Sequence, residues 1–239
     1  MSKLAIISGG SKGLGAALVD LYQHQGFSVV ELSRTGQSAS SVSVDLAQPQ
    51  QVVTAVSERF AQLSQQTYDE IILFNNAGVI SPIGAVADKA LDDIVANINV
   101  NFTSAILLIR AFAEAFQEHN CPKTIVNISS GAALHGIYGW SLYCGAKAGI
   151  EHFVRTVAIE QAEQPHPIKT VNVGPGIIDT GMQQAIRDSS AADFPGVDRF
   201  RSFKESGALR SPETVAAAVG RILAAAPESG SRHDISDYV

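Results

Sequence analysis

The chain has 239 residues, of which 46% are hydrophobic and 17% charged, and its formal net charge is −6. This hydrophobic share excludes an intrinsically disordered chain, and the acidic balance without a basic run argues against a nucleic-acid partner. Two cysteines are too few for a disulfide scaffold, and no apolar run reaches the roughly 20 residues that span a bilayer. We therefore expect a cytoplasmic protein without a membrane partner.

Short apolar runs that predict buried strands alternate with longer segments of helical periodicity. The expected strands span residues 3–8, 28–33, 70–75, 124–129 and 168–173. The expected helices span residues 14–25, 49–66, 88–118, 142–163 and 212–226. Strands that are apolar throughout are typical of a parallel sheet covered by helices on both faces. Pro49 and Pro212 suit the first turn of their helices, with Ser211 as a cap.

This alternation predicts an α/β fold, a doubly wound parallel sheet of about seven strands that forms a single domain over residues 1–239. The stretch 176–210 is long, polar and mixed, and it follows the strand that ends near Val173. Ligands of open α/β sheets bind beyond the carboxyl ends of strands, so we expect this stretch to cover a substrate as a lid. A surface insertion without function is the competing interpretation.

A glycine-rich turn joins the first expected strand to the first expected helix. In a Rossmann fold, three glycines at this spacing make the tight turn, let the backbone approach a pyrophosphate and let the helix pack on the strand. The helix amino end then offers N–H groups to phosphate. A turn without a ligand is the competing interpretation. The loop residues expected to contact the dinucleotide are Gly9, Ser11, Lys12, Gly13, Leu14 and Gly15.

The end of the second expected strand predicts which dinucleotide binds. An NAD site usually carries an acid there, whereas this chain has Ser33 followed by Arg34. A guanidinium can pair with a 2′-phosphate, and Lys12 adds a second positive charge. The sequence therefore predicts NADPH/NADP+ as cofactor. Solvated surface side chains are the competing interpretation for both cations.

Polar residues gather where the later strands end. Tyr143 and Lys147 lie one helical turn apart and share a face of their helix. Ser130 ends the strand 124–129, so all three are expected at the carboxyl edge of the sheet beside the glycine loop. Asn101 lies in a helical segment that is too rich in asparagine for helix propensity to explain.

Together these motifs resemble those of the short-chain dehydrogenase/reductase family over essentially the whole chain. Within the family, residues 139–147 and 175–184 resemble segments of sepiapterin reductases and of bacterial reductases that convert benzil to benzoin. The matching family positions are Gly9, Gly13, Gly15, Asn75, Asn76, Ala77, Gly78, Asn101, Ser130, Tyr143, Lys147, Pro175 and Gly176.

The resemblance implies carbonyl chemistry with Tyr143 as proton donor and Ser130 bound to the substrate oxygen. Lys147 would hold the nicotinamide ribose, and Asn101 would support a water relay to it. We expect Lys147 and an oxidised, cationic nicotinamide to lower the pKa of Tyr143. Ser130 as a strand-end cap and Asn101 as a helix-kink residue are competing interpretations. Further cofactor contacts are expected at Asp45, Asn76, Ala77, Gly78, Pro175, Gly176, Ile178 and Thr180.

Three residues besides Ser130 and Tyr143 are assigned to the substrate. Trp140 is expected to line its pocket, with a packed core tryptophan as the alternative, and Met182 lies in the expected lid. Asp234 resembles the acid that anchors the pterin in sepiapterin reductases. An exposed tail carboxylate, or one that pairs with Arg232 or with another chain, is the competing interpretation. The histidines lack metal-ligand spacing, so we expect no metal.

The leading hypothesis is an NADPH-dependent carbonyl reductase of a small ketone or diketone, assembled as a homodimer or homotetramer. A non-catalytic NADP(H)-sensing protein on the same fold is one alternative, and an oxidative alcohol dehydrogenase is another. Tyr143 and Lys147 argue against the sensor. Ser33 and Arg34 argue against the NAD-dependent oxidative enzyme.

Overall fold

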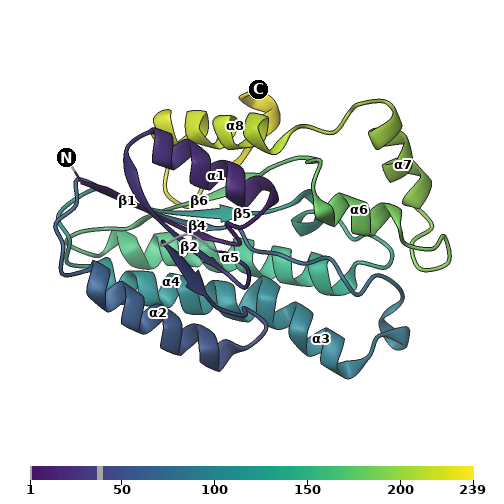
Figure 1. Cartoon of the computed structure of the whole chain (residues 1–239), viewed down its shortest axis with the longest axis horizontal. Helices are drawn as coiled ribbons and strands as arrows, with labels where there is room; N and C mark the ends of the chain where they lie inside the picture. Colours follow the sequence, from purple (N-terminus) through teal and green to yellow (C-terminus); the bar gives the residue numbers. More distant parts are fainter. Residues whose placement is uncertain (1, 37–39) are drawn as a thin grey trace.

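One parallel sheet runs through the molecule, with helices on both of its faces (Figure 1). The computed structural model describes residues 2–36 and 40–239; residues 1 and 37–39 of the expected domain lie outside this part. The strands are β1 (Lys3–Ser8), β2 (Phe27–Ser33), β3 (Ser41–Ser43), β4 (Glu70–Asn75), β5 (Lys123–Ile128), β6 (Lys169–Gly174) and β7 (Arg232–Asp234). Their order is β3-β2-β1-β4-β5-β6-β7, with all neighbours parallel. This confirms the expected doubly wound Rossmann sheet.

Two apolar layers hold the helices to the sheet. The core on one face is formed with α1 and α8, and the core on the other with α2, α4 and α5. In Figure 1 these sets lie above and below the sheet, and α6 and α7 project at one end. The helices are α1 (Gly13–His24), α2 (Pro49–Leu63), α3 (Leu91–Ile98), α4 (Ser104–Phe116), α5 (Ser141–Ala162), α6 (Gly181–Arg187), α7 (Val197–Glu205) and α8 (Pro212–Ala224).

The topology places a ligand site between β1 and β4. The chain proceeds from β1 to β2 on one side and continues from β4 to β5 on the other, so the connections diverge at this point. The crevice outside the carboxyl ends of such strands is where open α/β sheets bind ligands. The glycine loop after β1 and the turn after β4 both lie at this edge.

The expected helix 88–118 is divided in the structure. A 3₁₀ turn at Val86–Asp88 precedes α3, and a π-helical turn at Asn99–Thr103 separates α3 from α4. Such turns are frequent at functional sites. Asn97 donates to the carbonyl of Ser81 over 2.7 Å, a tertiary contact that no local helix propensity encodes.

Two edge strands were missed by the sequence pattern. β3 and β7 have three residues each, too few for a periodicity to emerge. The stretch 176–210, expected as a loop or broken helical excursion, contains α6 and α7. The predicted cap of α8 is confirmed, because Ser211 Oγ accepts from Thr214 N over 3.2 Å.

A stretch of the described chain, Leu91–Phe116, is apolar and long enough to cross a membrane by length and composition alone. Its Leu108, Phe112 and Phe116 are buried in the core of the sheet face that also carries α2 and α5. Core helices of soluble proteins share this composition, so the stretch is weak evidence for a membrane span.

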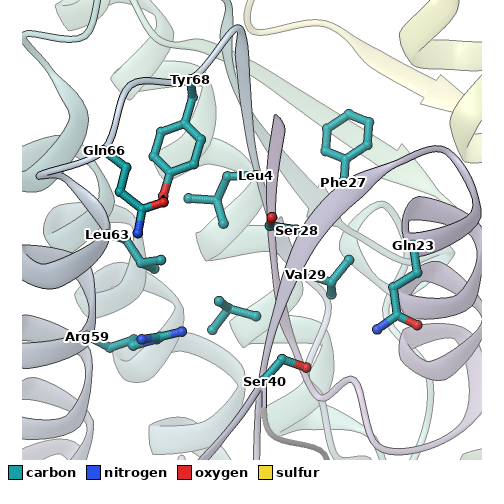
Figure 2. Close-up of a pocket in the computed structure, with 11 residues that line it drawn as sticks. Leu4, Gln23, Phe27, Ser28, Val29, Ser40, Arg59, Leu63, Gln66 and Tyr68 are labelled. Atoms are coloured by element: carbon teal, nitrogen blue, oxygen red, sulfur yellow. The ribbon is translucent and has the colours of Figure 1, made fainter. Parts of the chain in front are cut away.

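An open hollow of about 430 Å³ lies at the opposite end of the strands from the glycine loop. Figure 2 shows Arg59 and Leu63 of α2 on one side of strand β2 and Gln23 of α1 on the other. Leu4 and Phe27 line it, and both stand at the amino ends of their strands. This hollow is therefore separate from the site described below.

Replacement of Phe112 by alanine should destabilise the fold strongly. Its side chain is fully buried on α4 and packs against Phe116 with ring centroids 5.1 Å apart. Loss of a buried phenylalanine typically costs about 3–5 kcal/mol. The free energy of unfolding in denaturant would measure this, with Ile159→Ala, at a 73% exposed residue, as the matched control. Equal effects of the two substitutions would contradict this assignment of the core.

Candidate active site

The glycine loop has the shape that a pyrophosphate requires. Gly9 and Gly13 have φ angles of +69° and +56°, which side-chain-bearing residues rarely adopt. A Cβ on Gly15 would lie 2.0 Å from the carbonyl oxygen of Gly9, so only glycine fits there. Lys12, the N-cap residue of α1, makes no side-chain cap hydrogen bond, which suits a helix end whose first N–H groups bind an anion. The loop therefore fits a dinucleotide phosphate.

The end of β4 is fastened to this loop by hydrogen bonds. Ser8 Oγ accepts from the backbone N–H groups of Asn76 and Ala77 over 3.0 and 3.1 Å. Asn76 Nδ2 donates to the carbonyl of Ser8 over 2.9 Å. A Cβ on Gly9 would lie 3.0 Å from the Cα of Ala77. The two motifs therefore form one surface, as their predicted role with the dinucleotide requires.

The turn after β2 carries positive charge at the surface. Ser33 is buried, and its Oγ accepts from Gly36 N over 2.9 Å, which holds the turn. Thr35 Oγ1 lies 3.2 Å from Ser11 Oγ of the glycine loop. Arg34 and Lys12 are both exposed. The turn and the glycine loop thus form the rim on which the predicted 2′-phosphate contacts lie.

Other predicted cofactor residues lie on neighbouring loops. Asp45 follows β3, and its Oδ1 accepts from Ala47 N over 3.0 Å. A Cβ on Gly13 would lie 3.2 Å from the Thr180 methyl group, so the loop after β6 touches the glycine loop. Gly176 has a φ angle of +66°, and the backbone of Ile178 forms an isolated parallel β-bridge with that of Arg210. Pro175 and Gly176 lead from β6 into this loop.

Asn101 lies in the π-helical turn with its side chain 2% exposed. Its Oδ1 accepts from Val79 N over 3.0 Å, and its Nδ2 donates to Val79 O over 2.8 Å. A Cβ on Gly78 would lie 3.2 Å from Asn101 Oδ1 and 3.7 Å from Lys147 Nζ. The structure thus brings Asn101 and Lys147 close to the same glycine.

Ser130, Tyr143 and Lys147 converge at the carboxyl end of β5. The Ser130 side chain lies close enough to Tyr143 to lower the pKa of the phenol. Lys147 Nζ donates to the carbonyl of Ile128 over 2.8 Å and lies 5.7 Å from the centroid of the Tyr143 ring. Ser130 Oγ also accepts from Ala132 N over 3.1 Å, so it caps the following turn as well. The structure therefore shows the cap, and the predicted role of Ser130 in the site stays a prediction.

Burial sets the acidity of the pair. It raises the pKa of Tyr143 to about 12, although the Ser130 side chain acts in the opposite direction. Burial also lowers the pKa of Lys147 to about 8. In the chain without nucleotide, desolvation of the phenolate outweighs the lowering expected from Lys147, and a lowered pKa with the oxidised nicotinamide bound stays a prediction. Tyr143 therefore holds its proton at neutral pH.

An aromatic cluster covers the tyrosine. Trp140 is buried and meets Tyr143 edge-on, with ring centroids 6.2 Å apart. Phe194 and Phe200, from the stretch 176–210, lie 5.2 and 5.5 Å from the Trp140 ring, and Met182 packs against the same cluster. The stretch 176–210 therefore contacts the predicted substrate side of the site with apolar groups.

Asp234 lies on β7, where its Oδ1 is 3.1 Å from Arg232 Nη2. This is the pairing given above as a competing interpretation. The structure also joins polar side chains that the sequence pattern did not connect with one another. Asn75, Asn127 and Asn172 stand side by side on β4, β5 and β6, linked by amide hydrogen bonds of 2.9 and 2.8 Å. An asparagine inside each of three apolar strands was the available indication.

Comparisons with known proteins agree with this geometry. The family model of the short chain dehydrogenases matches residues 3–191. A benzil reductase ((S)-benzoin forming) of Bacillus subtilis is 36% identical over 99% of this chain and 100% of its own length. A benzil reductase ((S)-benzoin forming) of Bacillus cereus is 32% identical over 92% of this chain and 94% of its own length.

A solved structure extends the comparison. An NAD(P)-dependent gluconate 5-dehydrogenase candidate from Beutenbergia cavernae, crystallised with NADP at low occupancy, is 25% identical and superposes with a TM-score of 0.79. The match covers 98% of this chain and 94% of that one. The chain belongs to the short-chain dehydrogenase/reductase family. It is an oxidoreductase that acts on carbonyl or alcohol groups with a nicotinamide cofactor.

Carbonyl reduction should slow as the pH rises through about 8, the pKa of Lys147. The ammonium is present below this pH and lost above it, and a cation beside Tyr143 favours the phenolate that proton donation leaves. The protonated lysine is therefore the active form. Initial rates at saturating reduced cofactor, measured from neutral to alkaline pH, test this. A reduction rate that rises across the same range would contradict it.

Proposed function

We propose that the protein is an NADPH-dependent carbonyl reductase that converts a ketone or 1,2-diketone to the corresponding alcohol. The observation that carries the proposal is the convergence of Ser130, Tyr143 and Lys147 beside a glycine loop that fits a dinucleotide. The names of the two Bacillus relatives support an aromatic diketone such as benzil as substrate. The aromatic cluster around Trp140 supports the same substrate class.

The glycine loop, Arg34 and Lys147 would hold NADPH, which would supply the hydride for the carbonyl carbon. Tyr143 then donates its phenolic proton to the carbonyl oxygen, so that hydride and proton together give the alcohol. The Ser130 hydroxyl donates a hydrogen bond to the same oxygen as negative charge develops there. The Lys147 ammonium stabilises the phenolate left on Tyr143, and Asn101 supports the return of a proton through water.

The cofactor preference is a separate part of the proposal. Ser33 is neutral where an NAD enzyme has an acid, and the exposed Arg34 and Lys12 stand on the rim of the glycine loop. NADP in the Beutenbergia cavernae protein supports this assignment. The proposal also includes a cytoplasmic location and assembly as a homodimer or homotetramer.

Tyr143→Phe should abolish reduction while it preserves cofactor binding. The substitution removes the proton donor, which typically contributes at least about 100-fold to turnover. The assay follows oxidation of NADPH with benzil as substrate, and a parallel titration measures binding of NADPH. Tyr138→Phe, at an exposed tyrosine nearby in the sequence, is the control and should keep full activity. Near-normal turnover of Tyr143→Phe would exclude the proposed proton donor.

Arg34→Asp should weaken NADPH by about one to two decades in affinity, because a charge-assisted pair with a phosphate is lost. NADH carries no 2′-phosphate, so its affinity should rise relative to that of NADPH. Titrations of both nucleotides measure the preference. Arg110→Asp changes the net charge equally on the exposed face of α4 and serves as the control. An unchanged preference in Arg34→Asp would show that another group contacts the 2′-phosphate.

A further inference from the structure

A buried polar cluster lies directly behind the site, and we call Ser129, Glu151 and Arg232 the Glu151 cluster. Glu151 stands one helical turn beyond Lys147 and two beyond Tyr143, on the same face of α5. Its side chain is only 3% exposed, and that of Arg232 is 13% exposed. The cluster joins the end of β5, the helix of the reactive tyrosine and the edge strand β7.

Each polar group of the Glu151 carboxylate has a partner. Ser129 Oγ donates to Glu151 Oε2 over 2.5 Å. Arg232 Nη1 donates to the same oxygen and to Ser129 Oγ, the latter over 3.3 Å. Arg155, a half-exposed side chain one turn along α5, lies 2.5 Å from Glu151 Oε1. The buried carboxylate is thus neutralised by two cations and oriented by three donors.

The position of the cluster links it to two parts of the site, Ser130 and the end of β6. Ser129 immediately precedes Ser130, and its N–H donates to the carbonyl of Val173 over 2.8 Å. A Cβ on Gly174 would lie 1.9 Å from Asp234 Oδ1 and 2.7 Å from Arg232 Nη2. The arginine therefore lies against the end of β6, just before the Pro175–Gly176 turn.

The row of hydrogen-bonded asparagines (Asn75, Asn127 and Asn172) adds a further link between α5 and β6. Asn172 Nδ2 donates to the backbone carbonyl of Glu151 over 3.3 Å, so α5 is hydrogen bonded to β6 at this residue. Charge-assisted hydrogen bonds are short and directional, whereas apolar contacts allow one element to slide on another. Apolar groups in place of a buried ion pair are often equally stabilising, so stability alone does not account for these charges.

We propose that Glu151 and Arg232 are positioning residues of the reductase site. Through Ser129 they fix the Ser130 hydroxyl relative to Tyr143, and they hold the turn after β6 in register with both. The kinetic consequence rests on the proposed function. The structural consequence, a fixed end of β5, does not depend on it.

Ser129→Ala and Glu151→Gln test the proposal. We expect kcat for benzil to fall about tenfold in each, because a small displacement of Ser130 from the substrate oxygen impairs the transition state. The KM for NADPH should rise less than kcat falls, because the variants disturb the turn after β6 but leave the glycine loop in place. Arg155→Ala removes the outer cation from the same carboxylate and should leave kcat unchanged. Ser129→Ala leaves the ion pairs of Glu151 with Arg232 and Arg155 in place. The kcat of Ser129→Ala therefore tests the proposal even if Glu151→Gln does not fold.

Amide hydrogen exchange of residues 128–132 gives a readout that needs no substrate. Faster exchange in Ser129→Ala and Glu151→Gln, but not in Arg155→Ala, supports the proposal even if the wild-type chain reduces no ketone, which would refute the proposed function alone. Wild-type kcat in both folded variants would overturn the proposal. A lower melting temperature with unchanged kcat and unchanged exchange in this segment would also overturn it, because the cluster would then serve stability only.

Discussion

The burial of Lys147 is the constraint on which the rest of the site depends. The residue is 4% exposed, its ammonium donates to the carbonyl of Ile128 over 2.8 Å, and burial lowers its pKa to about 8. The carbonyl offsets part of the cost of burying this cation, and Gly78 leaves room beside it. The same enclosure raises the pKa of Tyr143, which therefore remains an acid until charge develops beside it.

The parallel sheet meets this constraint by placing polar side chains at the carboxyl ends of otherwise apolar strands. Ser8 ties the glycine loop to the turn after β4, and the three asparagines of β4, β5 and β6 form a row beneath α5. Such groups add little net stability, because each loses its hydrogen bonds to water on folding. Their hydrogen bonds are directional, however, and they fix where the helix of Tyr143 lies on the sheet.

The sequence predicted those features that depend on local chemistry. Gly9 and Gly13 adopt the positive φ angles that only glycine takes easily, and Ser211 caps α8 as expected. The features that it missed depend on contacts between distant residues. Arg232 binds Glu151, which lies 81 residues earlier in the sequence. At the π turn of Asn99–Thr103, the side chains of Asn97 and Asn101 are hydrogen bonded to the segment after β4. The direction of the Tyr143 pKa change was missed because burial is a property of the folded chain.

The ionisation of Tyr143 is the most direct test of this account. The phenolate absorbance of the wild-type chain minus that of Tyr143→Phe, followed against pH, isolates this one hydroxyl. We expect no phenolate through the neutral range in the nucleotide-free protein. When NADP+ is bound, we expect the transition to shift to lower pH, because the cationic ring of the nucleotide favours the phenolate. A phenolate at neutral pH without nucleotide would contradict the account.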